Sequence, residues 1–127
     1  MPQGLILFAH GARDPRWALP FEDTAARIRA RRPDVALRLA YLEFMTPDLS
    51  GATAELVAAG CTRIALLPMF LGSGGHVRKD LPLLLDGLRN THTGTRFELH
   101  TAIGEVDSVL QAMADAALAL LETRVHT

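Results

Sequence analysis

Residues 63–76 read RIALLPMFLGSGGH, an apolar run of strand length that passes into a glycine-rich turn and ends at His76. The part from Arg63 to Phe70 is the most apolar run in the chain, which is typical of a parallel strand covered on both faces. A second run of this kind, residues 4–9, is followed directly by His10 and Gly11. The two stretches predict buried strands of a parallel α/β sheet, each followed by a histidine.

Segments with helical signals separate the runs of strand type. Asp14-Pro15 and Thr46-Pro47 are typical of helix starts, because a short polar side chain accepts the free N–H groups of the first turn and proline tolerates the first helical position. We expect strands over 4–9, 35–44, 63–70 and 96–103, and helices over 14–32, 47–59, 80–90 and 107–123. This alternation predicts one flavodoxin-like α/β domain over residues 1–127, with a four-stranded parallel sheet in the order 2-1-3-4 and helices on both faces.

Composition narrows the classes of function. The 127 residues include 13 basic and 14 acidic side chains, so the overall charge gives no reason to expect nucleic acid as a partner. The single cysteine excludes an intramolecular disulfide and suits a reducing compartment. The apolar stretch from Leu5 to Ala9 is too short for a signal-peptide core or a membrane span. We therefore expect a cytoplasmic protein without a membrane partner.

The predicted strand order brings the two histidines together. Strands one and three are neighbours in that order, and ligands of parallel α/β sheets bind beyond the carboxyl ends of the strands. Neighbouring strands lie about 4.8 Å apart, so His10 and His76 could face one bound ion. Imidazole binds divalent metals and also accepts protons near neutral pH. Taken singly, each histidine has an alternative interpretation as a surface or capping residue.

Other polar groups surround this predicted crevice. The loop from Gly72 to Gly75 lacks the lysine and the hydroxyl of a P-loop, but its exposed N–H groups could receive carboxylates. Four cations follow the two histidines: Arg13, Arg16, Arg78 and Lys79. Solvated surface charge is the alternative for each of them, and as a set they favour an acidic small molecule. Glu43, near the end of the second strand, is either turned to solvent or held in the site.

Three segments carry a resemblance to a known family. They are HGARDP at 10–15, LEF at 42–44 with Pro47, and PMFL at 68–71 leading through the glycine loop to HVRKDLP at 76–82. Together they resemble the sirohydrochlorin chelatases of the short CbiX type. The resemblance implies a class II chelatase fold and a lyase that inserts Co2+ or Fe2+, with Ni2+ as a further candidate, into a tetrapyrrole of cobalamin or siroheme biosynthesis. It also implies a homodimer and no cofactor beyond the substrate metal.

The same resemblance implies roles for individual residues. His10 and His76 would hold the metal and act in catalysis, with His10 accepting the pyrrole protons, and Glu43 would assist proton removal. The residues expected to bind the anionic tetrapyrrole are Arg13, Thr46, Leu71, Gly72, Ser73, Gly74, Gly75 and Arg78. The glycine loop differs in detail from the family pattern, which leaves the contacts there open.

Two other functions remain as alternatives at this point. A metal carrier would bind cobalt, nickel or iron without acting on a tetrapyrrole, but the cluster of cations argues mildly against it. Ala9-His10-Gly11 is also similar to the Arg-His-Gly of histidine phosphatases. Ala9 stands in place of that arginine, so a phosphorylated histidine here would lack the arginine that binds the phosphate.

Overall fold

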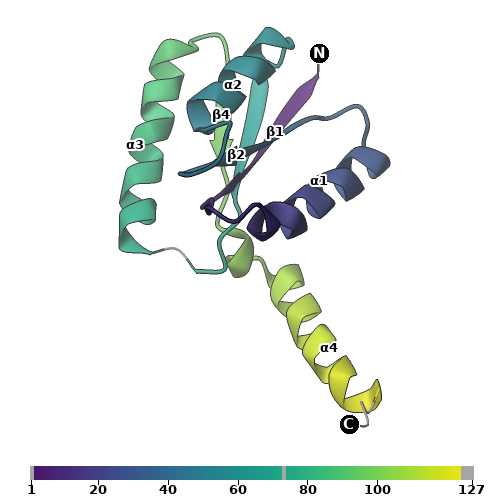
Figure 1. Ribbon diagram of the computed structural model, residues 1–127. Helices are drawn as coiled ribbons and strands as arrows, with labels where there is room; N and C mark the ends of the chain where they lie inside the picture. Colours follow the sequence, from purple (N-terminus) through teal and green to yellow (C-terminus); the bar gives the residue numbers. More distant parts are fainter. Residues whose placement is uncertain (1, 73, 124–127) are drawn as a thin grey trace.

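The computed structural model describes residues 2–72 and 74–123, apart from the side chains at 76–78 and 123. Its four strands are all parallel and follow the order β2-β1-β3-β4, which confirms the predicted order (Figure 1). The strands are β1 (Gln3–Ala9), β2 (Ala36–Tyr41), β3 (Arg63–Pro68) and β4 (Arg96–Leu99). The helices are η1 (Pro15–Ala18), α1 (Leu19–Arg31), α2 (Leu49–Ala58), α3 (Gly75–Thr91), η2 (Ile103–Glu105) and α4 (Asp107–Thr123).

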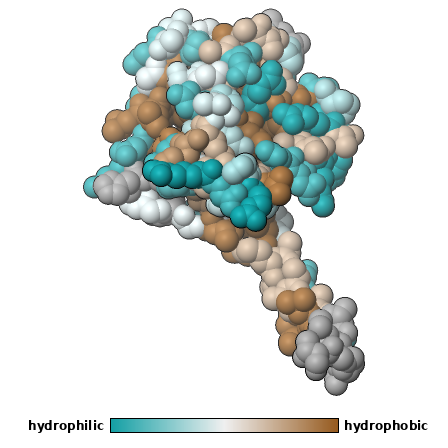
Figure 2. Space-filling view, viewed as in Figure 1, coloured by the Kyte–Doolittle hydropathy of each residue, from teal (hydrophilic) through white to brown (hydrophobic). Residues whose placement is uncertain are grey.

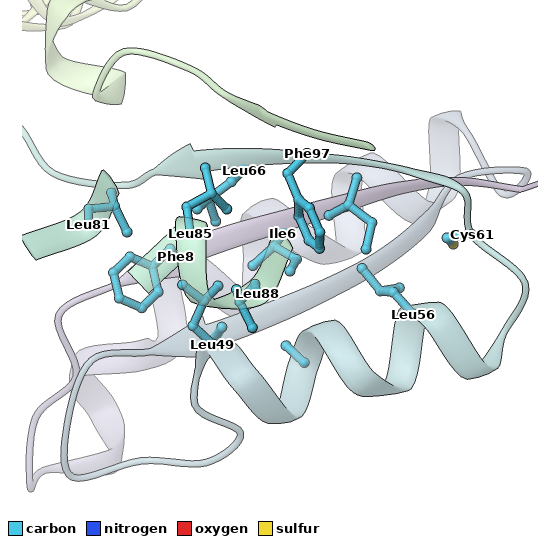
Figure 3. Packing of buried hydrophobic residues seen from close by; sticks show 13 residues of the cluster. Ile6, Phe8, Leu49, Leu56, Cys61, Leu66, Leu81, Leu85, Leu88 and Phe97 are labelled. Carbon is cyan, nitrogen blue, oxygen red and sulfur yellow. The ribbon is translucent and has the colours of Figure 1, made fainter. Parts of the chain in front are cut away.

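Successive residues of the central strands pack alternately into two hydrophobic clusters, one on each face of the sheet. On one face, α2 and α3 pack over a cluster that includes Ile6, Phe8 and Leu66 (Figure 3). On the other face, α1 places Ala25 over Leu7 and Leu37. Since successive side chains of a strand point to opposite faces, both faces are apolar only because β1 is a nearly continuous apolar run. The chemistry of the molecule is therefore confined to the ends of the strands.

The second strand is shorter than the predicted range of 35–44. It ends at Tyr41, whose N–H is bonded to the carbonyl of Pro47, so the chain between them forms a closed loop. Within this loop Phe44 has a φ of 66°, and the peptide before Pro47 is cis. The cap of α2 is also Asp48, rather than Thr46, because the Asp48 carboxylate accepts the N–H of Gly51 at 2.8 Å. Glu43 consequently lies in a loop and is not part of a strand.

The third helix begins five residues earlier than the predicted start at Asp80. It starts at Gly75, with Gly74 in extended conformation at the cap position. Pro82 lies inside the helix, in its third turn rather than at its start. His76 is thus the second residue of α3 and not part of a loop. The fourth strand also ends early, at Leu99, and the residues from Ile103 to Glu105 form η2 instead.

The last helix differs from the others in its surroundings. Figure 1 shows α4 pointing away from the sheet, and residues 111–122 are all exposed. Its main contacts within the chain are with the short helix η2. No helix among the described residues is both long enough and apolar enough to cross a membrane.

Cys61 offers a simple test of the core. Its side chain is 2% exposed beside the end of α2, and burial raises the pKa of the thiol. A raised pKa lowers the thiolate fraction at neutral pH, and the thiolate is the reactive form. We expect a thiol reagent at pH 7 to modify the native protein more than about tenfold more slowly than the denatured protein. Equal rates in the two states would contradict this packing.

Candidate active site at the carboxyl edge of the sheet

The site is built around a contact between two residues far apart in the sequence. His10 follows the last residue of β1, and its Nε2 lies 3.1 Å from Oε1 of Glu43. Both side chains are about half exposed, at 51% for His10 and 48% for Glu43, so the pair is open to a ligand from solvent. A carboxylate accepts a hydrogen bond from one imidazole nitrogen, so it fixes the orientation of the ring and the position of its N–H proton. The other ring nitrogen of His10 is then left as the acceptor.

Backbone contacts hold the two loops together. The N–H of Leu42 donates to the carbonyl of Ala9, and the N–H of Glu43 donates to the carbonyl of His10. Gly11 then passes so close to the second loop that a Cβ there would lie 1.9 Å from the carbonyl oxygen of Glu43. Its φ is +91°, which glycine adopts without strain. This close approach lies directly beside the contact between His10 and Glu43.

Aromatic and basic groups extend the site on both sides. The ring of Phe70, after β3, meets the His10 ring edge to face with centroids 6.4 Å apart. On the other side, the guanidinium of Arg13 lies 5.0 Å from the ring centroid of Phe44. Phe44 is 57% exposed although it is a large apolar residue.

A groove opens between the loop after β2 and helix α3. It has a volume of about 460 Å³ and is lined by Leu42, Leu83, Leu84, Gly87 and Asp80. A smaller hollow of about 200 Å³ shares Leu42 and Leu84 with it and reaches Phe8. The groove thus shares Leu42 with the loop that carries Glu43, and its apolar lining suits a ligand with a flat apolar body.

Several of the residues predicted to bind the tetrapyrrole are exposed at this edge of the sheet, and others are not among the described residues. Thr46, Leu71, Gly72, Gly74 and Gly75 are exposed, and nothing lies within 4 Å of a Cβ built at Gly72, Gly74 or Gly75. Ser73 and the side chains of His76 and Arg78 lie outside the described residues. The side chains that are described contain no group of three metal-binding residues.

Arg16 and Ala9 bear on two of the sequence-based hypotheses. The Arg16 guanidinium is bonded to Asp14 at 2.8 Å, and these hydrogen bonds lower the pKa of the Asp14 carboxyl. Arg16 therefore has an anionic partner within its own loop, whereas no carboxylate among the described side chains pairs with Arg13 or Lys79. Ala9 is fully buried, and its methyl group cannot bind an anion beside His10 as an arginine would. This disfavours a phosphatase.

Comparison with known proteins agrees with this geometry. The family model of CbiX matches residues 4–119. The chain belongs to the CbiX family. A crystal structure of a CbiX protein from Marinobacter aquaeolei VT8 superposes with a TM-score of 0.84 at 31% identity, covering 97% of this chain and 100% of that one. SirB from Bacillus subtilis, solved with Fe3+, has a TM-score of 0.76 at 21% identity over 91% of this chain and 46% of SirB, which supports the fold.

One curated relative is named by its own activity. The sirohydrochlorin cobaltochelatase of Methanosarcina acetivorans is 34% identical over 82 residues. The aligned part makes up 65% of this chain and 63% of that relative's length. The resemblance to CbiX chelatases inferred from three short motifs is thus confirmed at the level of the family.

Two residues beside the candidate site have no role in the sequence-based prediction. Phe44 lies against Arg13, and Leu84 lines the groove. The pattern Leu83-Leu84-Leu85 is a signal that could have been used, because Leu85 alone fills the buried position. The other two leucines are then in excess of what the core needs.

Proposed function

We propose that this protein is a sirohydrochlorin chelatase, which inserts Co2+ or Fe2+ into the tetrapyrrole. The observation that carries the proposal is the half-exposed pair of His10 and Glu43 beside an apolar groove, in a chain of the CbiX family. Relatives named as sirohydrochlorin cobaltochelatases support the substrate. The metal is a substrate of this reaction, and we propose no other cofactor.

His10 and Glu43 supply the proton chemistry. When a divalent metal enters the macrocycle, four metal–nitrogen bonds form and two pyrrole protons leave. The neutral imidazole of His10 takes up the two protons one after the other, and the Glu43 carboxylate stabilises the imidazolium formed each time. Each proton then passes to solvent before the next is taken up, because both side chains are half exposed. We assign His10 as the base and Glu43 as the group that orients it.

His10 also contributes to holding the incoming metal, and we propose His76 as its second ligand. His76 is the second residue of α3, which follows the loop after β3, and β3 is the neighbour of β1. A site with two protein ligands keeps coordination positions open. This suits a metal that must be surrendered to the macrocycle.

The rest of the edge is proposed to hold the macrocycle. Its apolar body would lie on Leu42, Phe44 and Leu71, all of them exposed in spite of their size. Its carboxylates would be met by Arg13, Arg78, Thr46 and the N–H groups of Gly74 and Gly75 at the start of α3. The N-terminus of a long helix attracts negative charge. No acidic residue in the first turn of α3 already occupies this position.

The decisive experiment is metal insertion followed by absorbance. Purified protein is mixed with sirohydrochlorin and Co2+, and product formation is compared with a protein-free control under the same conditions. A chelatase forms the product faster than the control. If the protein binds Co2+ but leaves the rate unchanged, it is a metal carrier and the proposal is wrong.

Replacing Glu43 by glutamine tests the orienting role. The amide keeps the shape and can still contact His10, but it no longer stabilises the imidazolium. We expect kcat to fall about 10- to 100-fold with little change in KM. Glu55→Gln serves as a matched control, because Glu55 is an exposed glutamate on α2 that pairs with Arg38. A rise in KM without a change in kcat would instead place Glu43 in substrate binding.

We also propose that the active form is a homodimer. The chain aligns with 46% of one SirB chain and 51% of another, so these proteins are about twice as long. Two copies of the present chain would provide an assembly of comparable size. The pathway served, cobalamin or siroheme, would follow from whether Co2+ or Fe2+ is preferred in the insertion assay.

A further inference from the structure

The short helix η2 meets the loop after β3 at Gly104. The N–H of Gly104 donates to the carbonyl of Phe70 at 3.0 Å. A Cβ built at Gly104 would lie 2.5 Å from the Cα of Leu71 and closer still to its carbonyl group. These are backbone atoms, which cannot swing aside as the end of a flexible side chain can. The φ of Gly104 lies outside the left-handed region, so lack of space is what requires glycine here.

The segment that carries Gly104 is itself held in place. Ala102 is 5% exposed, and Ile103 and Val106 are partly buried. Just before them, the N–H of His100 donates to the carbonyl of Leu66 on β3 at 3.0 Å. Figure 2 shows apolar residues gathered where the projecting helix joins the body of the molecule. Helix η2 is therefore a fixed support against which the loop after β3 rests.

Phe70 connects this support to His10. While its carbonyl accepts the N–H of Gly104, its ring meets the rings of Phe8 and His10 edge to face, with centroids 6.0 and 6.4 Å away. The residue before it is also fixed, because the N–H of Met69 donates to the carbonyl of Phe8 at 2.7 Å. A displacement of the Phe70 backbone would therefore move the ring that lies against His10.

His10 is thus contacted from two loops. Glu43 meets its Nε2 from the loop after β2, and Phe70 meets the ring from the loop after β3. Gly104 is not among the described residues that line the groove or the smaller hollow beside it. Any effect of Gly104 on the chemistry must consequently pass through the loop of Phe70 and Leu71.

We infer that Gly104 is a positioning residue of the active site. Because it has no side chain, η2 can support the backbone of Phe70 and Leu71 directly, and Phe70 in turn holds the ring of His10. The kinetic consequence rests on the function proposed above, in which His10 is the base. The contacts themselves do not depend on that function.

The first test observes His10 in protein without metal or tetrapyrrole. The resonances of its two carbon-bound ring protons are recorded by nuclear magnetic resonance on protein with labelled histidine, and they are assigned by their loss in His10→Ala. The ring current of Phe70 acts on these protons, so Phe70→Leu should shift them, and Gly104→Ala should shift them as well. Gly94→Ala is the matched control, because its methyl group would enter open space. Unshifted signals in Gly104→Ala, or equal shifts in Gly94→Ala, would overturn the inference.

The second test is metal insertion at a temperature where the variants are folded. We expect Gly104→Ala to lower kcat about 10- to 100-fold, since a displacement of about 1 Å in a catalytic group can cost 100-fold. If Gly104 acts through Phe70, adding Phe70→Leu to Gly104→Ala should lower kcat by no more than about threefold further, whereas independent effects would multiply. Multiplying effects would show that Gly104 does not act through Phe70.

Phe70→Leu also covers the case in which Gly104→Ala does not fold. It removes the ring but leaves the backbone contact with Gly104 intact. Unchanged His10 signals together with an unchanged kcat in Phe70→Leu would show that Phe70 does not hold His10, and the inference would be wrong. Since the spectra are recorded without substrates, shifted signals in a protein that inserts no metal would refute the chelatase proposal alone.

Discussion

Replacing His10 by alanine is expected to lower kcat for metal insertion about 100- to 10,000-fold, the range that a positioned general base contributes. The variant loses the imidazole that accepts the pyrrole protons, and the nearest remaining carboxylate, Glu43, is left without its partner at 3.1 Å. The fold should survive, because His10 is half exposed and Glu43 can be solvated. The measurement is the initial rate of absorbance change with sirohydrochlorin and Co2+.

A matched control is available at the opposite edge of the sheet. His92 caps the end of α3 through its backbone, whose N–H donates to the carbonyl of Leu88 and whose carbonyl accepts the N–H of Thr95. His92→Ala should keep the rate of insertion within about threefold of the unaltered protein, as expected for a residue remote from the chemistry. Titration with Co2+ alone adds a second readout. If His10 is a metal ligand, the His10→Ala variant must also bind Co2+ more weakly than the unaltered protein. Normal turnover by that variant would remove His10 from the mechanism.

The framework of the fold could be predicted because it depends on local patterns. The apolar runs of β1 and β3 leave no polar face, which only a sheet covered on both sides tolerates. The order of strands then follows from the crossovers, and it places His10 and Phe70 next to each other. These steps need only the periodicity of the sequence and the general rules of parallel sheets.

The details of the site depend on contacts that no local pattern reveals. Glu43 was predicted at the end of a strand, but it reaches His10 because Phe44 adopts a φ of 66° and the loop closes from Tyr41 to Pro47. Phenylalanine rarely adopts such a conformation, so its residue type gives no warning. The exposure of α4 was equally hidden. Its spacing predicts an apolar face correctly, but periodicity does not say which molecule covers that face.

Gly11 takes no part in the proton chemistry, but we expect Gly11→Ala to lower the stability of the protein strongly. A left-handed backbone costs a residue with a Cβ about 1–2 kcal/mol, and here the added methyl group would also collide with the carbonyl of Glu43. We expect the free energy of unfolding to fall by at least about 2 kcal/mol. For a chain of this length this corresponds to a loss of roughly 8 °C in Tm.

The same substitution should also damage insertion at temperatures where the variant is folded. Relief of the collision requires the loop of His10 to move away from the loop of Glu43, and a displacement of about 1 Å can cost 100-fold in rate. Gly94→Ala is the control, because its Cβ would meet nothing within 4 Å and it lies far from this edge, between α3 and β4. Thermal unfolding and the insertion assay are measured on both variants. If Gly11→Ala matched Gly94→Ala in both, the close approach of the two loops would not be what holds His10 against Glu43.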